Sequence, residues 1–277
     1  MYIANNEDFV ETAEEAAVYT DMKDKAGLKI DKDIPLSIAS YIDSAHACEQ
    51  PTIVVGDLHG KHKIVDAVLA LNQPVVFIGD YLDSFCESFD SQIKTITKVL
   101  DAVENGKAIA LMGNHEMSYL NPDMKSSGYN DSMSSLLMSD FRNGKTIRSA
   151  MHELLLPYYF AEGFLISHAG VSNKILKYTN ATLDEYLDER KFGDIGWARG
   201  GDSRIGGLYW CDWDEEFEPI PYQRQIVGHS VRSDGKIGVK MNSYCIDVLD
   251  HGYKTKTIVE IKDGRLSTRN IKIKHHV

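Results

Sequence analysis

Five short apolar runs in this chain each lead into a stretch of glycine and polar residues. They occupy residues 53–55, 75–78, 108–112, 164–167 and 225–227. Their β-branched and aliphatic residues favour buried strands. Between the first three runs, apolar residues at helical spacing predict helices over 61–71 and 91–104. This alternation predicts parallel strands joined by right-handed crossovers, and the carboxyl ends of such strands share one crevice.

The rest of the pattern predicts further helices and a β-rich end. The expected elements are helices over 146–155 and 183–190, and strands over 243–248, 255–261 and 266–273. Gly264 supplies a hairpin turn between the last two strands. Residues 1–50 predict two packing helices, with a substrate lid as the alternative. Because no linker divides the chain, we expect one domain over 1–277 with a helical extension at 1–50.

The first strand leads into two side chains that bind metals, Asp57 and His59. Residues two apart in an extended backbone point to the same side, so both side chains can reach one ion. Alone this is a weak signal. The other strand ends, however, also offer such residues: Asp80, Asp83, Asn114, His115, His168 and His229. Five strand ends of this kind predict a dinuclear metal site.

Together these segments resemble the calcineurin-like metallophosphoesterases. Within that family they resemble the phosphoprotein-phosphatase group, which includes serine/threonine phosphatases and dinucleoside polyphosphate hydrolases. The resemblance rests on GDxHG at 56–60, GDxxD at 79–83, GNHE at 113–116, HAG at 168–170 and GH at 228–229, in the family's order. It implies an α/β (α+β) fold, a four-layer sandwich of two mixed β-sheets flanked by helices.

The resemblance also implies a set of metal ligands. They are Asp57, His59, Asp80, Asn114, His168 and His229. Asp80 would bridge two divalent ions, because its two oxygens can serve both. Oxygen and nitrogen ligands without thiolate suit manganese, iron or zinc better than calcium, and we expect manganese. Two such ions clamp a phosphoryl group and lower the pKa of a bridging water.

The residues beside these ligands have implied roles in proton transfer. The resemblance makes His115 the general acid that protonates the leaving oxygen, with Asp83 orienting it and keeping it charged. An imidazole needs a carboxylate partner to stay protonated near neutral pH. Glu116 has two interpretations: a hydrogen-bond acceptor that supports a metal ligand, or a structural residue at the start of the following segment.

One position departs from the family pattern. Ser84 stands where the family has an arginine that forms bidentate hydrogen bonds with phosphate oxygens. A glycine-rich stretch over 197–207 carries two arginines that would compensate, and its glycines allow close approach to a ligand. We expect Arg199 and Arg204 to bind phosphate, with Arg199 first. A flexible surface loop with solvated arginines is the alternative.

Composition limits the partners and the compartment. The 277 residues carry a net charge of −11, which argues against tight binding of duplex nucleic acid. The four scattered cysteines form no CxxC pair and are expected to be reduced. We find no signal-peptide pattern at the start and no apolar run long enough to cross a membrane. These features predict a cytoplasmic protein without a membrane partner.

The function predicted from sequence is a dinuclear metal-dependent phosphoesterase. We expect a serine/threonine protein phosphatase-like phosphomonoesterase, in which metal-bound hydroxide attacks a phosphorylated protein or a small phosphoester. Hydrolysis of dinucleoside polyphosphates or cyclic phosphodiesters is the alternative. A second alternative, supported by Ser84 alone, is a weakly active metal-binding regulatory protein that recognises phosphorylated partners.

Overall fold

The computed structural model describes residues 50–121, 125–188, 205–249 and 254–273. A first five-stranded sheet has the order β12-β11-β1-β2-β3. Its strands are β1 (Thr52–Val55), β2 (Val75–Phe77), β3 (Ala108–Ala110), β11 (Thr255–Lys262) and β12 (Arg265–Lys272). The first three strands pair in parallel, and β11 and β12 add antiparallel neighbours. This sheet is therefore mixed.

A second five-stranded sheet has the order β6-β7-β8-β10-β9. Its strands are β6 (Tyr158–Ala161), β7 (Phe164–Ser167), β8 (Arg224–Val227), β9 (Gly238–Lys240) and β10 (Ser243–Cys245). Strands β7, β8 and β10 are parallel, whereas β6 and β9 pair antiparallel at the two edges. The parallel strands of both sheets supply the loops that carry the motifs.

Helices connect and cover the sheets. Helix α3 (His62–Leu69) links β1 to β2, and α4 (Phe89–Glu104) links β2 to β3. The segment between β3 and β6 holds α5 (Asn114–Leu120), α6 (Asp131–Ser139), α7 (Ile147–Leu154) and the short hairpin of β4 (Phe141–Arg142) and β5 (Lys145–Thr146). The segment between β7 and β8 holds α8 (Asn173–Thr179), α9 (Leu183–Asp188) and α10 (Gly207–Trp210).

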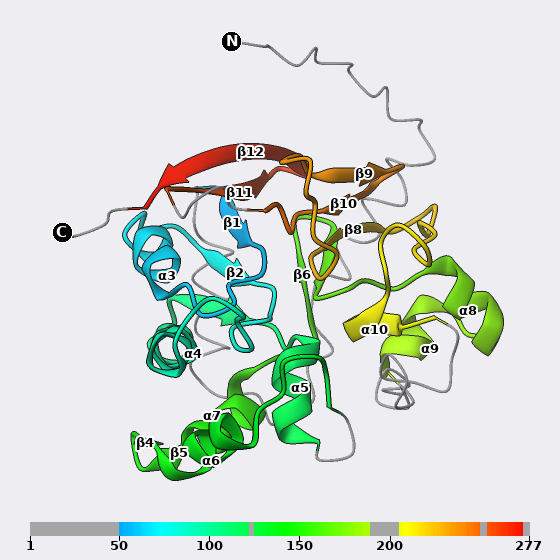
Figure 1. Ribbon diagram of the computed structural model, residues 1–277. Coiled ribbons are helices and arrows are strands. Elements are labelled where there is room, and N and C mark those ends of the chain that lie inside the picture. Colours follow the sequence, from blue (N-terminus) through cyan, green and yellow to red (C-terminus); the bar gives the residue numbers. More distant parts are fainter. Residues whose placement is uncertain (1–49, 122–124, 189–204, 250–253, 274–277) are drawn as a thin grey trace.

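Side chains on the two faces of β7 enter different cores. Phe164 and Ile166 join the large core that includes residues of both sheets, and Leu165 packs with residues of α8, α9 and α10. Helices α3 and α4 contact each other and lie on the side of the molecule opposite α8–α10 (Figure 1). The order of layers is helices, sheet, sheet, helices. The predicted α/β four-layer sandwich is therefore confirmed.

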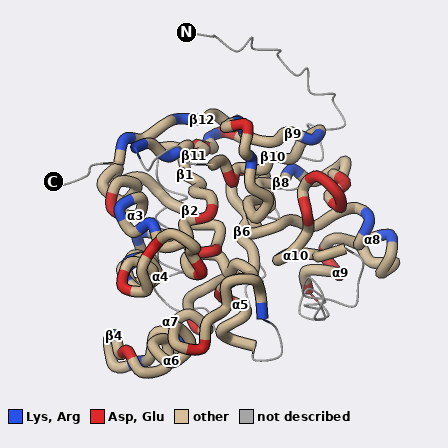
Figure 2. The backbone as a smooth tube through the Cα atoms, in the orientation of Figure 1, with Lys and Arg blue, Asp and Glu red and all other residues tan. Residues whose placement is uncertain are grey.

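Basic residues lie along the outer edge of the first sheet. Strand β12 is an edge strand and carries Arg265, Arg269 and Lys272. Figure 2 shows blue, basic segments along this strand. Charged side chains on an edge strand discourage pairing with another chain.

At the β11–β12 turn, Asp263 and Gly264 both have positive φ angles, 48° and 71°, which is the geometry of a type I′ hairpin turn.

The predicted elements that fall on the described residues are present, and several of their ends differ from the predicted ones by one to three residues. The strand predicted from the apolar run 108–112 ends at Ala110, because the Met112 N–H donates to the Leu156 carbonyl (2.8 Å) outside the sheet. The strand predicted over 243–248 ends at Cys245. Residues 1–49, with the predicted helical extension, lie outside the described residues. In the described ranges no helix is long and apolar enough to cross a membrane.

Candidate metal centre

The motif residues gather where five parallel strands end. Asp57 and His59 follow β1, Asp80 follows β2 and Asn114 begins α5 after β3, while His168 and His229 follow β7 and β8. Two groups of side chains place potential ligand atoms within 4.8 Å of one another: His59, Asp80 and His115 in one, and Asp80, His168 and His229 in the other. Asp80 belongs to both groups.

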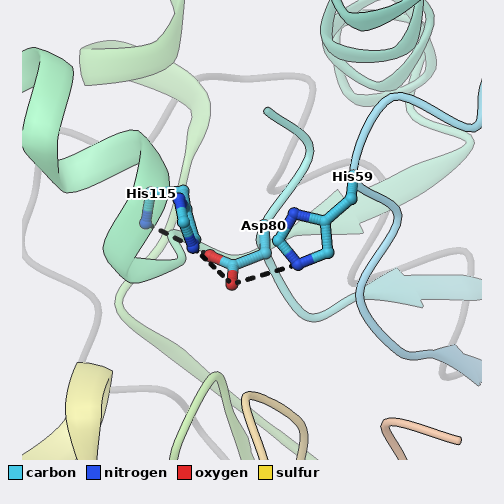
Figure 3. A group of neighbouring side chains, drawn as sticks. All are labelled: His59, Asp80 and His115. Atoms are coloured by element: carbon cyan, nitrogen blue, oxygen red, sulfur yellow. Dashed lines mark hydrogen bonds and ion pairs between the residues drawn. The ribbon is translucent and has the colours of Figure 1, made fainter. Parts of the chain in front are cut away.

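The first group centres on one oxygen of Asp80. The Nε2 atoms of His59 and His115 each lie 3.8 Å from the Asp80 Oδ2 atom (Figure 3). The His59 Nδ1–H donates to the Leu82 carbonyl at 2.9 Å. This bond selects the tautomer of His59 that leaves Nε2 as an acceptor, as a metal ligand requires.

The second group has a similar construction and includes the same oxygen of Asp80. His168 Nδ1–H donates to the Ile78 carbonyl (3.0 Å), and His168 Nε2 lies 3.4 Å from Asp80 Oδ2. Asn114 Oδ1 lies 2.9 Å from His168 Nε2 and 3.0 Å from His229 Nδ1. Thus one amide oxygen, one carboxylate and two imidazoles converge. Burial lowers the pKa of His229 to about 3, which keeps its imidazole neutral.

Asp57 is buried beside these groups. Its carboxylate accepts from the backbone N–H of His229 at 3.2 Å, which connects the loop after β1 with the loop after β8. A Cβ atom on Gly228 would lie 2.4 Å from Asp57 Oδ1, so only glycine fits there. Burial raises the pKa of Asp57 to about 6, and the nearby charge of Asp80 acts in the same direction.

These residues fit two divalent cations. Burial, with the nearby charge of Asp80, makes the ionised form of Asp57 costly, as its raised pKa indicates. Cations would reverse that penalty. The donors are oxygen and nitrogen atoms without thiolate, a set typical of manganese, iron or zinc. His115 differs from the other histidines of the site in that its Nδ1–H donates to a carboxylate, that of Asp83, as described next.

His115 and Asp83 form a buried hydrogen-bonded pair. His115 Nδ1–H donates to Asp83 Oδ2 at 2.9 Å, and the hydroxyl of Tyr119 donates to the other Asp83 oxygen. Ser126 Oγ lies 3.3 Å from His115 Nδ1. Burial alone would lower the pKa of His115, but Asp80 and Asp83 together raise it to about 9. A protonated imidazole in this position can act as a proton donor.

Four residues of the site have backbone angles that L-amino acids rarely adopt. His59, Asp80, Asp83 and His229 have φ angles of 40°, 53°, 56° and 64°. Each such residue costs about 1–3 kcal/mol unless its surroundings fix it. Close packing supplies that constraint at Asp80, because a Cβ atom on Gly113 would lie 2.1 Å from Asp80 Oδ1. The fold thus stores strain where the ligands converge.

The two interpretations of Glu116 prove to be one. Its carboxylate is fully buried and accepts from the backbone N–H groups of Asp80 (2.8 Å), Tyr81 (2.8 Å), Leu82 (3.1 Å) and Gly113 (3.1 Å). The bond to Gly113 caps helix α5, and the bonds to residues 80–82 hold the loop of a proposed ligand. Glu116 therefore has a structural role that also supports Asp80.

Ser84 takes a local role in its turn. Its Oγ accepts from the backbone N–H groups of Cys86 (3.2 Å) and Glu87 (3.0 Å), and the neighbouring Phe85 is 85% exposed. The hydroxyl therefore stabilises the turn after Asp83. Arg199 and Arg204, the predicted compensating residues, lie outside the described residues, so their role stays a prediction.

Sequence reasoning missed several residues around the centre. Tyr119 and Ser126 contact the His115–Asp83 pair, and Lys256 is fully buried with Nζ donating to the Asp57 carbonyl at 3.2 Å. Tyr119 follows His115 at helical spacing and was open to prediction. Lys256 was not, because it lies in a distant alternating strand whose pattern marks it only as one of several inward positions.

Comparisons with known proteins agree with this geometry. A family model described as calcineurin-like phosphoesterase matches residues 50–233, about two thirds of the chain. No curated protein matches this chain significantly by sequence. Among solved structures, a mutant cold-active protein tyrosine phosphatase has a TM-score of 0.51 at 15% identity, covering 81% of this chain and 80% of that one.

Two further structures have lower scores. The cold-active protein tyrosine phosphatase of a psychrophilic Shewanella species has a TM-score of 0.49 at 16% identity, covering 79% of this chain and 80% of that one. A candidate diadenosine tetraphosphatase has a TM-score of 0.46 at 15% identity, covering 80% and 93%. At 15% identity, the structure with the TM-score of 0.51 supports the fold alone, and the two with lower scores carry no argument. The family match over residues 50–233 is the stronger finding, and by it the chain belongs to the calcineurin-like phosphoesterase family and is a hydrolase of phosphate esters.

Proposed function

We propose that this protein is a dinuclear metal-dependent phosphomonoesterase of the serine/threonine protein phosphatase type. The observation that carries the proposal is the position of Asp80, whose carboxylate is shared by two groups of converging ligand atoms. A shared carboxylate is what two ions about 3.5–4 Å apart require. The expected substrates are phosphorylated proteins or small phosphoesters.

Six residues would hold the two ions, and manganese is the proposed metal. They are Asp57, His59, Asp80, Asn114, His168 and His229. When bound, the two ions polarise the phosphate ester and acidify a coordinated water. We place the protein in the cytoplasm as one domain, with no membrane or duplex nucleic acid as partner.

The chain's own residues supply the proton for the leaving group. Asp83 and Tyr119 hold His115 from its Nδ1 side, so that Nε2 faces Asp80. His115 would donate its Nε2 proton to the ester oxygen as the phosphorus–oxygen bond breaks. Asp83 stabilises the charged imidazole before that transfer, and the raised pKa keeps the proton in place at neutral pH.

A second candidate is hydrolysis of dinucleoside polyphosphates or cyclic phosphodiesters. The observation that favours it is the use of Ser84 Oγ as a turn acceptor. A monoester dianion carries more charge than a diester, so it loses more when a guanidinium is missing. The third possibility, a weakly active regulatory protein that binds phosphorylated partners, has the same observation as its only support.

Turnover of p-nitrophenyl phosphate with added Mn²⁺ tests the proposal. Asp80→Asn should lose most bound metal and nearly all turnover, because an amide cannot bridge two cations as a carboxylate does. His152→Ala, on the exposed face of α7, is the control and should behave as wild type. Full metal content and near-normal activity in Asp80→Asn would refute the dinuclear proposal. Metal binding by the wild type without turnover would favour the regulatory alternative.

A further inference from the structure

A third acidic side chain, Asp247, lies behind the proposed site of the first ion. It follows β10 in the loop after Cys245 and is 6% exposed. A Cβ atom on Gly56 would lie 3.4 Å from the Asp247 Cα atom and 2.9 Å from the Ile246 carbonyl oxygen. The backbone at Asp247 is therefore packed against the residue that precedes Asp57.

One oxygen of Asp247 is buried and has no hydrogen-bond partner in the described part of the chain. This atom is Oδ2. A buried carboxylate oxygen without a donor costs free energy, so such an atom calls for an explanation, for example a bound ion or water. The backbone carbonyl of Asp247, by contrast, accepts from the Arg232 N–H at 2.7 Å. The backbone carbonyl of Asp247 thus has a hydrogen-bond donor, whereas the side-chain Oδ2 atom has none in the described residues.

The surroundings of Asp247 are rich in negative charge. The charges that act on it come from Asp57, Lys256, His59 and Asp80. Of these, Asp57, His59 and Asp80 are the proposed ligands of the first ion. Lys256 contributes one positive charge, and its Nζ donates to the Asp57 carbonyl. A cation held by Asp57 and His59 would therefore also attract the nearby carboxylate of Asp247.

We propose that Asp247 is a positioning residue for the first divalent ion, its unpartnered oxygen accepting a hydrogen bond from a water that completes the ion's coordination. The proposal rests on the ligand set given under the proposed function. Residues that hold the ligands of a metal from outside typically change its affinity by about 10–100-fold. A purely structural aspartate would instead bond to backbone N–H groups, as Glu116 does.

The test measures Mn²⁺ binding and metal-free stability, neither of which depends on turnover. Asp247→Asn keeps the side-chain shape and removes its charge. It should bind Mn²⁺ about 10–100-fold more weakly in calorimetric titration. At pH 8, its metal-free form should unfold at the same temperature as wild type or a few degrees higher, because a repulsive carboxylate is gone.

Glu216→Gln is the matched control. Glu216 is a buried carboxylate that accepts from the backbone N–H groups of Gly206 and Asp212, both at 3.0 Å. This variant should lower metal-free stability and leave Mn²⁺ affinity unchanged. The inference is overturned if Asp247→Asn binds Mn²⁺ within twofold of wild type, or if its metal-free form is destabilised or unfolded. Failure of the wild type to bind Mn²⁺ would instead refute the proposed function.

Discussion

Glu116 holds the backbone N–H of Asp80 with a hydrogen bond of 2.8 Å, and this bond joins two neighbouring motifs of the sequence. The left-handed backbone of Asp80, with φ of 53°, needs such a constraint. The same carboxylate bonds the next two N–H groups of the loop. The direction of the Asp80 carboxylate is therefore set by a residue that touches no substrate.

We expect Glu116→Gln to lose both stability and metal. The amide keeps one oxygen and turns an NH₂ group toward backbone donors, so about two of the four N–H groups lose their acceptor. At about 1–3 kcal/mol for each buried donor left unsatisfied, the loss is about 2–6 kcal/mol. Urea unfolding measures it, and metal analysis should show reduced Mn²⁺ content. Glu216→Gln should lose stability alone; equal metal loss in both variants would contradict a specific link to Asp80.

Acid catalysis predicts a dependence on the leaving group. His115→Asn should retain Mn²⁺ and lose a factor of roughly 10²–10⁴ in turnover of alkyl phosphates, the usual contribution of a positioned acid. The loss should be much smaller for p-nitrophenyl phosphate, because its leaving group needs no proton. Steady-state rates on both substrates give the comparison. The same loss on both would point to structural damage and would argue against the assignment of His115.

The metal-free protein should lose stability as the pH rises above neutrality. His115 and His168 have pKa values of about 9 and about 10 in the folded state, above the ordinary 6.5. Their contribution is complete below pH 6.5 and is lost as the pH rises through the folded values, because only the folded state retains the protons. Each proton adds a slope of up to about 1.4 kcal/mol per pH unit.

Urea unfolding of chelator-treated protein between pH 7.5 and 9.5 measures this slope. The buried carboxyl groups of Asp57 and Glu116, with pKa values of about 6 and about 7, have mostly titrated below that window. His115→Asn should show a shallower slope than wild type. A slope that does not change in this variant would contradict the pairing of His115 with Asp83. Bound Mn²⁺ should also flatten it, since His168 must be neutral to bind metal.

The strands that carry the motifs could be predicted from the sequence, because each is a short apolar run with potential ligand residues at its end. Within one sheet, parallel strands bring their ends together, as for Asp57 after β1 and Asp80 after β2. What could not be predicted was the support between distant segments. Nothing near Asp247 indicates that its neighbour is Gly56, since that contact depends on how the two sheets pack.

The same limit applies to Ser84. The sequence showed that Ser84 departs from the family pattern. It did not show that the Ser84 hydroxyl stabilises the turn after Asp83. A serine that accepts from the N–H groups two and three residues later forms a local turn, as Ser84 does with Cys86 and Glu87. With serine at position 84, the turn after Asp83 brings no cationic side chain from this position to Asp83. The question of substrate therefore depends on where a phosphate-binding cation comes from.

Arg199 is the residue we expect to supply that cation, and its removal should affect monoesters most. A charge-assisted hydrogen bond is worth about 1.5–3 kcal/mol, or roughly a tenfold to hundredfold rate effect if it forms fully in the transition state. Arg199→Ala should therefore lower kcat/KM for a phosphomonoester by roughly that factor, and for a phosphodiester by less. Ser84→Arg should shift preference toward monoesters, although it removes the acceptor for two N–H groups of the turn. Parallel assays of a phosphopeptide, a cyclic nucleotide and a dinucleoside polyphosphate give the ratios. If Arg199→Ala leaves monoester turnover unchanged, the prediction that Arg199 compensates for the missing family arginine is wrong. The enzyme would then work with a weaker phosphate clamp, and a preference for diesters or anhydrides should already be present in the wild type.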